Sequence, residues 1–130
     1  MATKLINDAR RLPAALARLL AYSSAVRARI ARVRAMGTVE AVEHWREGKY
    51  LVLVSPMRAG VRERKFIGSD PANIRAARAK IARHAEVLAL LSALHGAEAL
   101  QRRVNDSLAA VHADLRPGQY ERRVKPWDKK

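Results

Sequence analysis

The side chains of this sequence best suited to chemistry are arginines that can hold the phosphates of a nucleic acid. Seven arginines stand between residues 10 and 34, and Asp8 is the only acid in the first 37 residues. On a helix with 3.6 residues per turn, Arg18, Arg29 and Arg32 share one side and can follow a phosphate backbone. The residues expected to contact phosphate in this segment are Arg18, Arg27, Arg29, Arg32 and Arg34.

Two alternatives to phosphate contact stay open for these arginines. They can form a solvated basic face, or they can pair with acids elsewhere in the chain, such as Glu86, Glu98 or Asp106. Nucleic acid is favoured because the chain has 26 basic residues against 12 acidic ones, and the acids are too few to neutralise the arginines.

A second basic cluster surrounds Gly60, where a turn between two strands is expected. A two-stranded ribbon fits the major groove of DNA and can present arginine to guanine edges. Edge strands also carry Lys and Arg to prevent aggregation, and this structural role explains the basic residues around Gly60 equally well. The candidate contacts here are Arg58, Arg62, Arg64 and Lys65, with Arg46 and Lys49 on the neighbouring strand.

The last 15 residues interleave aromatic rings with cations. Tyr120 and Trp127 stand among six basic residues, an arrangement that suits stacking on unpaired bases. Trp127 can equally anchor the tail on the helices. The candidate contacts in residues 116–130 are Arg122, Arg123, Lys125 and Trp127.

Nothing in the sequence supports catalysis, a metal or a cofactor. The four histidines have no second histidine or carboxylate at ligand spacing, and the chain has no cysteine. No serine stands in a nucleophile motif, and no glycine-rich loop could cradle a phosphate. We therefore expect neither an enzyme nor a small-molecule substrate.

The overall charge of the chain also favours a polyanionic partner. The net charge of +14 on 130 residues opposes a compact fold unless a polyanion relieves it. No apolar run reaches the roughly 18–20 residues that cross a bilayer, so no membrane association is expected. A cytoplasmic protein is the default, although the Arg-rich first 36 residues also read as a mitochondrial transit peptide.

Two long helices are expected to position these residues. Apolar positions spaced by three and four run from Ala9 to Val33, with Pro13 expected to begin the regular helix and Gly37 to end it. Asp70 and Pro71 are typical of a helix start. The second helix is either one long kinked helix or two helices that meet near Gly96.

Between the helices, residues 38–68 predict a small antiparallel sheet of two or three strands. Tyr50–Val54 is apolar on both faces, as in a central strand, and residues 61–67 return from the turn at residues 58–60. Residues 38–45 form the weakest strand and could instead be a short helix.

The prediction is thus a mainly helical α+β protein, with a single domain over residues 1–115 and a basic tail over residues 116–130. In this fold the second helix packs against the first. Because two helices and three strands bury little core alone, we also expect a homodimer.

Residues 36–112 resemble a family of uncharacterised bacterial proteins that are frequent on mobile elements. The matching stretches are Met36-Gly37-Thr38-Val39-Glu40, Trp45-Arg46-Glu47-Gly48-Lys49-Tyr50, Gly60-Val61-Arg62-Glu63-Arg64 and Ile81-Ala82-Arg83-His84. The resemblance implies the layout of helix, small sheet and Arg-rich helix, and a mobile-element setting. Many members carry a cysteine cluster between the first two strands, which is absent here, so no metal carries over.

The function that these observations favour is non-catalytic binding of nucleic acid, with DNA favoured over RNA, in a phage, plasmid or transposable element. The alternatives are an inhibitor or assembly protein whose basic face meets an acidic protein, and an RNA or ribosome binder.

Overall fold

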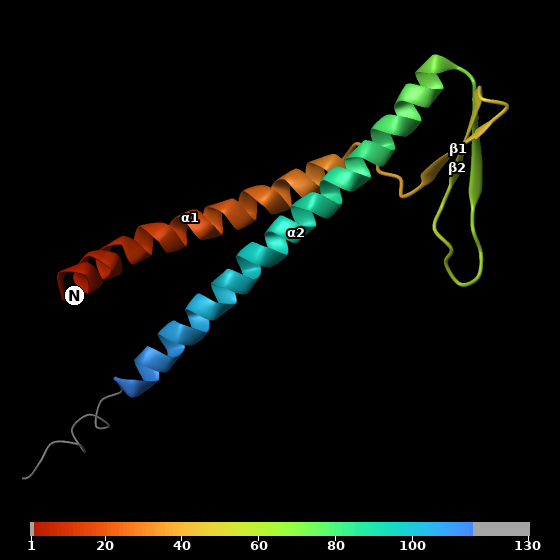
Figure 1. The fold of residues 1–130 in the computed structure, drawn as a ribbon. Coiled ribbons are helices and arrows are strands. Elements are labelled where there is room, and N and C mark those ends of the chain that lie inside the picture. Colours follow the sequence, from red (N-terminus) through yellow and green to blue (C-terminus); the bar gives the residue numbers. More distant parts are fainter. Residues whose placement is uncertain (1, 116–130) are drawn as a thin grey trace, which may run out of the picture. The chain divides into compact units, whose positions relative to one another are not determined.

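The computed structural model describes residues 2–115 and has two long helices with a three-stranded antiparallel sheet between them in sequence (Figure 1). The order is α1 (Ala2–Ala35), β1 (Val42–Arg46), β2 (Tyr50–Val54), β3 (Arg64–Gly68) and α2 (Pro71–Asp114). This confirms the mainly helical α+β prediction, with three strands rather than two. The chain forms two units, residues 20–94 and the remaining helix ends, which are described separately.

In the unit of residues 20–94, α1 packs on α2 through an apolar seam. Val26, Ile30 and Val33 of α1 form one buried cluster with Val87 and Leu94 of α2. The spacing of three and four residues in α1 puts its three members on one side of the helix, as the sequence predicts. The second helix therefore packs against the first.

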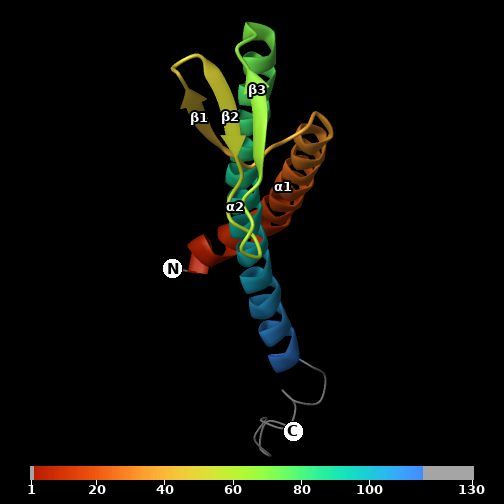
Figure 2. The same cartoon turned by 90° about the vertical axis from the view of Figure 1, so that its right-hand side faces the viewer.

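A second cluster joins the sheet to the beginning of α2. Leu51 and Leu53 of β2 are buried against Ala77, with Ile74 and Ile81 packed around them. In Figure 2 the sheet stands in front of this part of α2, so one sheet face is covered by the helix and the other faces away from it. Along its length, α2 thus uses one stripe for the sheet and another for α1.

Both tight turns of the sheet are built on positive φ angles. In the β2–β3 hairpin, Ala59 and Gly60 have φ of 52° and 77°, and Arg58 and Val61 exchange two backbone hydrogen bonds of 2.9 Å. In the β1–β2 turn, Glu47 and Gly48 have φ of 54° and 69°. Positive φ at both central residues is the signature of a type I′ turn, whose twist matches that of the strands.

The predicted caps of the helices are present. The carboxylate of Asp70 accepts a hydrogen bond of 3.0 Å from the amide of Ala72, and Pro71 occupies the first helical position. Gly37, just past the end of α1, has φ of 98°. This left-handed conformation ends the helix and suits glycine because it has no Cβ.

The predicted start of the first helix is wrong, and the structure decides between the two alternatives for the second helix. The helix α1 does not begin at Pro13 but runs through it from Ala2. A proline removes one helical hydrogen bond, here to the carbonyl of Ala9, and because Ala9 is exposed, water can satisfy that group. Of the two alternatives for the second helix, the structure has the single one: α2 is continuous through Gly96, whose cost of about 1 kcal/mol is small beside the packing of a 44-residue helix.

The first strand, predicted over residues 38–45, is present but later and shorter, at Val42–Arg46. Residues 38–41 instead form a connection that lies on α2, where Val39 and Ala41 pack on the sheet cluster. The amide of Val39 donates to the carbonyl of Lys80.

The other unit contains the helical residues 2–19 and 95–115, whose apolar side chains are largely exposed. Leu5 is 72% and Leu115 68% exposed, and Leu12 and Leu108 are exposed as well. The predicted apolar seams thus continue into this unit, where Ala97 is buried but the leucines toward the helix ends are exposed.

Candidate nucleic-acid interface

The face of the sheet that points away from α2 is the most distinctive surface of residues 20–94. Leu51 and Leu53 point toward α2, so the alternate residues Tyr50, Val52 and Val54 point the other way. Their register partners point with them, because directly paired residues in a sheet share a face. We call this surface the outer face, made of Val42, His44, Arg46, Tyr50, Val52, Val54, Arg64 and Phe66.

Cations border an apolar floor on the outer face. A hollow of about 170 Å³ is lined by His44 and Arg46 from β1, Val52 and Val54 from β2, and Arg62 and Arg64 beside them. No carboxylate is among these lining residues. The hollow therefore combines three guanidinium groups with two aliphatic side chains, a composition that suits an anion with an apolar body.

Two aromatic rings extend this face. Phe66 is 62% exposed, and its ring centroid lies 6.2 Å from that of Tyr50. The ammonium of Lys49 stands 5.2 Å from the centroid of the Tyr50 ring. An exposed ring beside cations is the arrangement that stacks on bases while charges hold phosphates.

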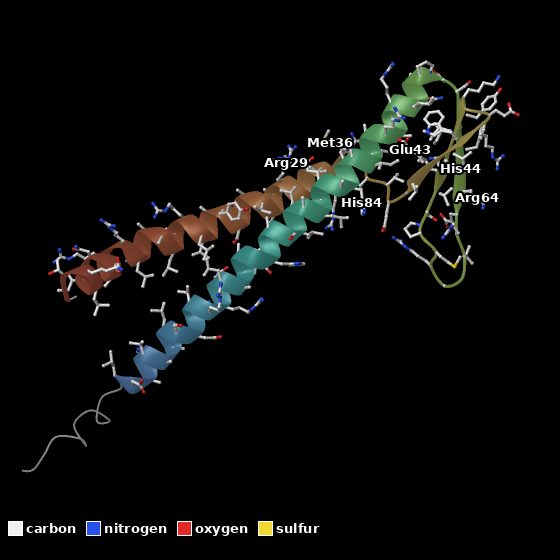
Figure 3. The ribbon with its side chains drawn as sticks, viewed as in Figure 1. Arg29, Met36, Glu43, His44, Arg64 and His84 are labelled. Atoms are coloured by element: carbon white, nitrogen blue, oxygen red, sulfur yellow. The ribbon has the colours of Figure 1, made fainter. Side chains whose placement is uncertain are left out.

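Glu43, the one acid of β1, is directed to the other side of the sheet. Glu43 accepts hydrogen bonds of 2.9 and 3.2 Å from the guanidinium of Arg78 in α2, which also stands 5.4 Å from the Trp45 ring centroid. Figure 3 shows Glu43 on the side of the sheet near α2 and Arg64 on the opposite side. This pairing ties β1 to α2 and leaves the outer face without the negative charge of Glu43.

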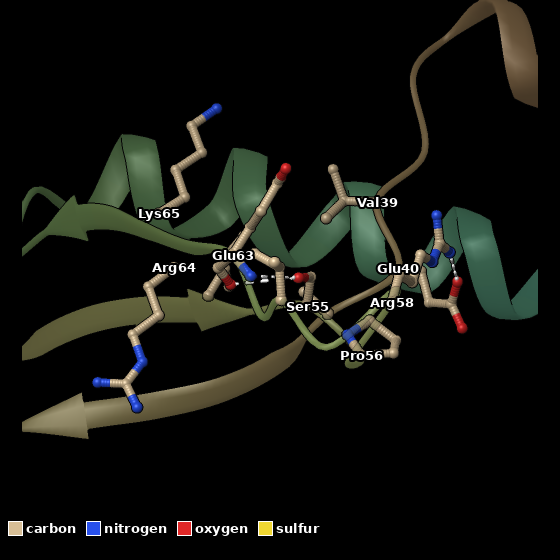
Figure 4. Close-up of a pocket in the computed structure, with 11 residues that line it drawn as sticks. Val39, Glu40, Ser55, Pro56, Arg58, Glu63, Arg64 and Lys65 are labelled. Carbon is tan, nitrogen blue, oxygen red and sulfur yellow. Dashed lines mark hydrogen bonds and ion pairs between the residues drawn. The ribbon is translucent and has the colours of Figure 1, made fainter.

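A larger pocket, of about 450 Å³, opens at the hairpin end of the sheet. Figure 4 shows Arg64 and Lys65 leaving β3 in opposite directions, and Arg58 paired with Glu40 across the pocket. The hydroxyl of Ser55 donates to the carbonyl oxygen of Glu63 at 3.2 Å and accepts from its amide at 2.9 Å. The mixed charges of this pocket make it a weaker anion site than the outer face.

The arginines of α1 fall on two sides of its buried seam. Helical geometry places Arg18, Arg29 and Arg32 on one side, and Arg27 and Arg34 on the other. Arg29 pairs with Glu86 of α2, at 2.9 Å from Nε and 2.8 Å from Nη2. Its charge is therefore partly neutralised, as one of the two alternatives for this segment expected.

The predicted contacts do not form one continuous site. Arg62 and Arg64 share the outer-face hollow, Arg58 and Lys65 do not line it, and the arginines of α1 belong to another element. The predicted tail contacts Arg122, Arg123, Lys125 and Trp127 lie outside the described residues.

Sequence reasoning missed the two aromatic rings of this surface. The sequence pattern places Tyr50 and Phe66 in strands and by itself predicts no part in binding for either. The available signal was the period of two in β3, which puts Phe66 on the same face as Arg64.

Within residues 2–115, no group of three or more His, Asp or Glu side chains is arranged to hold a metal ion. No helix of the described part combines the length and apolar content needed to cross a membrane. Comparisons with protein-family models, with curated proteins and with solved structures find no match to this chain.

Proposed function

We propose that this protein binds DNA without catalysing a reaction, as a cytoplasmic accessory or regulatory protein of a phage, plasmid or transposable element. The observation that carries the proposal is a surplus of exposed cations. The net charge is +14, and several of the acids already form ion pairs within the protein. Glu40, Glu43 and Glu86 each pair with an arginine of the same unit. The mobile-element setting rests on the resemblance of residues 36–112.

The arginines of α1 would supply contacts to phosphate. Arg18, Arg32 and Arg34 are exposed and have no ion-pair partner among the described residues. Arg29 keeps 49% of its side chain exposed beside Glu86. Contacts of this kind give affinity for any sequence and weaken as salt rises.

The β2–β3 hairpin would supply what sequence selectivity there is. Arg62 and Arg64 are exposed, whereas Arg58 is held by Glu40. A free guanidinium on a ribbon can bind the O6 and N7 atoms of guanine in the major groove. Changing Arg62 or Arg64 should then alter the preference between sequences rather than weaken all of them alike.

We further propose that the protein is a homodimer formed by the ends of its helices. Leu5, Leu12, Leu108 and Leu115 are exposed in the unit of residues 2–19 and 95–115. Repeated leucines on long helices are what a second helical partner buries. A dimer would also bring two sets of α1 arginines to one DNA molecule.

The test is a mobility-shift titration of the full chain with random duplex DNA, single-stranded DNA and RNA near physiological salt. Binding of the random duplex near micromolar concentration supports the proposal, because sequence-independent phosphate contacts give dissociation constants of about 10⁻⁴–10⁻⁶ M at physiological salt. Preference for RNA would favour an RNA or ribosome binder instead. Failure to bind any of the three would favour an inhibitor or assembly protein with an acidic protein partner.

A further inference from the structure

We propose that the outer face of the sheet binds a single-stranded nucleic acid, with a base stacked on Phe66 and a phosphate held by Arg46 and Arg64. This inference rests on the proposed nucleic-acid binding but concerns a different surface from the arginines of α1. It also assigns a role to two aromatic residues that duplex binding leaves unused.

The charge of the outer face selects a polyanion. Arg46 and Arg64 line the same hollow from β1 and from β3, on either side of the central strand, together with Arg62. None of the eight residues that define the outer face is acidic, and the one acid of β1, Glu43, is turned to the α2 side and paired with Arg78. An acidic side chain beside a phosphate would repel it. Because Glu43 lies on the α2 face and the arginines lie on the outer face, the outer face is the one that favours phosphate.

The apolar part of the outer face selects bases. Phe66 is 62% and Val42 70% exposed, whereas Val52, between His44 and Phe66 in the register, is only 3% exposed. The side chains around Val52 therefore form a continuous surface over β2. An exposed ring in such a surface offers a flat π face to a base.

The geometry favours a single strand over a duplex. Bases in a duplex stack on each other, so only unpaired bases can stack on a protein ring. The open face of the three-stranded sheet is similar in layout to the sheets of proteins that stack unpaired bases on aromatic side chains.

The binding experiment compares single strands with a duplex on the same protein. The probes are fluorescein-labelled oligothymidylate and oligouridylate of about 12 nucleotides, and a mixed-sequence duplex of about the same length. Anisotropy titrations are run on the wild type and on Phe66→Leu, Phe66→Trp and Tyr22→Leu. Tyr22 is the matched control because it is also an exposed ring, at 50%, and lies on α1.

We expect Phe66→Leu to weaken single-strand binding by about 5- to 150-fold, the loss of one stacked base, and to change duplex binding by less than about twofold. Phe66→Trp should retain single-strand binding because it keeps an aromatic face, and Tyr22→Leu should have no effect. The ratio of oligothymidylate to oligouridylate affinity tells DNA from RNA as the source of the strand. Circular dichroism checks that each variant is folded, which the exposure of Phe66 favours.

Two results overturn this inference while leaving the proposed function intact. One is duplex binding with no measurable single-strand binding by the wild type. The other is a Phe66→Leu variant that binds single strands as well as the wild type does, or that loses duplex and single-strand affinity equally. If the wild type binds none of the probes, the proposed function fails together with the inference.

Discussion

The Nε atom of Arg83 in α2 donates a 2.7 Å hydrogen bond to the carbonyl oxygen of Gly37, the residue just beyond the end of α1. One turn away, the amide of Val39 donates to the carbonyl of Lys80. The chain that leaves α1 is thereby fixed to α2 at two points before β1 begins. Both contacts fix the position of the connection that leads into β1, the first strand of the outer face.

Replacing Arg83 with methionine should lower the free energy of unfolding by about 1.5 kcal/mol. The substitution keeps the aliphatic stem but removes a charged donor from a half-buried carbonyl, which is then left unsatisfied. Urea denaturation followed by circular dichroism measures the loss. Arg75→Met, at an exposed position of the same helix, is the control, and an equal loss in both variants would contradict a role for the Gly37 contact.

The sequence predicts an element best where a single local requirement, such as burial on both faces or helix capping, determines the structure. The bounds of β2 were predicted as Tyr50–Val54 because a run that is apolar on both faces fits only a central strand. The start of α2 followed from Asp70 and Pro71, whose capping chemistry is local. Such features need no knowledge of distant residues.

The faces of the outer strands were not predictable in this way. Phe66 and Ile67 are adjacent and both apolar, so only the alternation of β3 with the charged Arg64 indicates which of them faces α2. The structure packs the half-buried Ile67 against the sheet cluster and exposes Phe66, which depends on the pairing of Val52 with Phe66. The pairing of Arg29 with Glu86 also joins residues 57 positions apart, so sequence could only offer it as one of several alternatives.

Replacing Ser23 with alanine should stabilise the protein by about 1 kcal/mol. The hydroxyl of Ser23 is buried, with 1% of the residue exposed, and has no hydrogen-bond partner among the described residues. Alanine removes the unsatisfied group and is a better helix former. Ser24→Ala, at the exposed neighbouring position, carries the same propensity gain, so the difference between the two variants in urea denaturation isolates the buried hydroxyl.

At the turn that contains Ala59, replacing alanine with a polar residue should stabilise the protein. Ala59 has φ of 52°, a conformation that costs an alanine about 1 kcal/mol and that asparagine tolerates, and Asn-Gly is the preferred type I′ pair. Ala59→Asn should raise the midpoint of urea denaturation. Ala82→Asn, in the middle of α2, should lower it by helix propensity alone, and a fall in both variants would refute the strain at residue 59.

The proposed homodimer predicts that Leu12→Glu shifts sedimentation equilibrium from dimer toward monomer. A carboxylate placed in a buried apolar contact is costly because it loses its hydration without a partner. Ala17→Glu puts the same charge on the opposite side of α1, where helical geometry directs the residue away from the seam, and it should leave the dimer intact. A monomeric wild type, or equal dissociation of both variants, would argue against this interface.

The proposed phosphate contacts predict a change in the salt dependence of DNA binding. Removing two contacts on one side of α1 with Arg18→Gln and Arg32→Gln together should reduce the slope of log K against log salt by about 2, since each contact releases about 0.9 of a counterion. Affinity should fall alike for all duplex sequences, because phosphates carry no sequence information. The matched control is Arg102→Gln with Arg103→Gln, which removes the same charge from exposed positions in the second half of α2. If both pairs lower the slope equally, the net charge of the chain rather than a localised α1 surface governs its attraction to DNA.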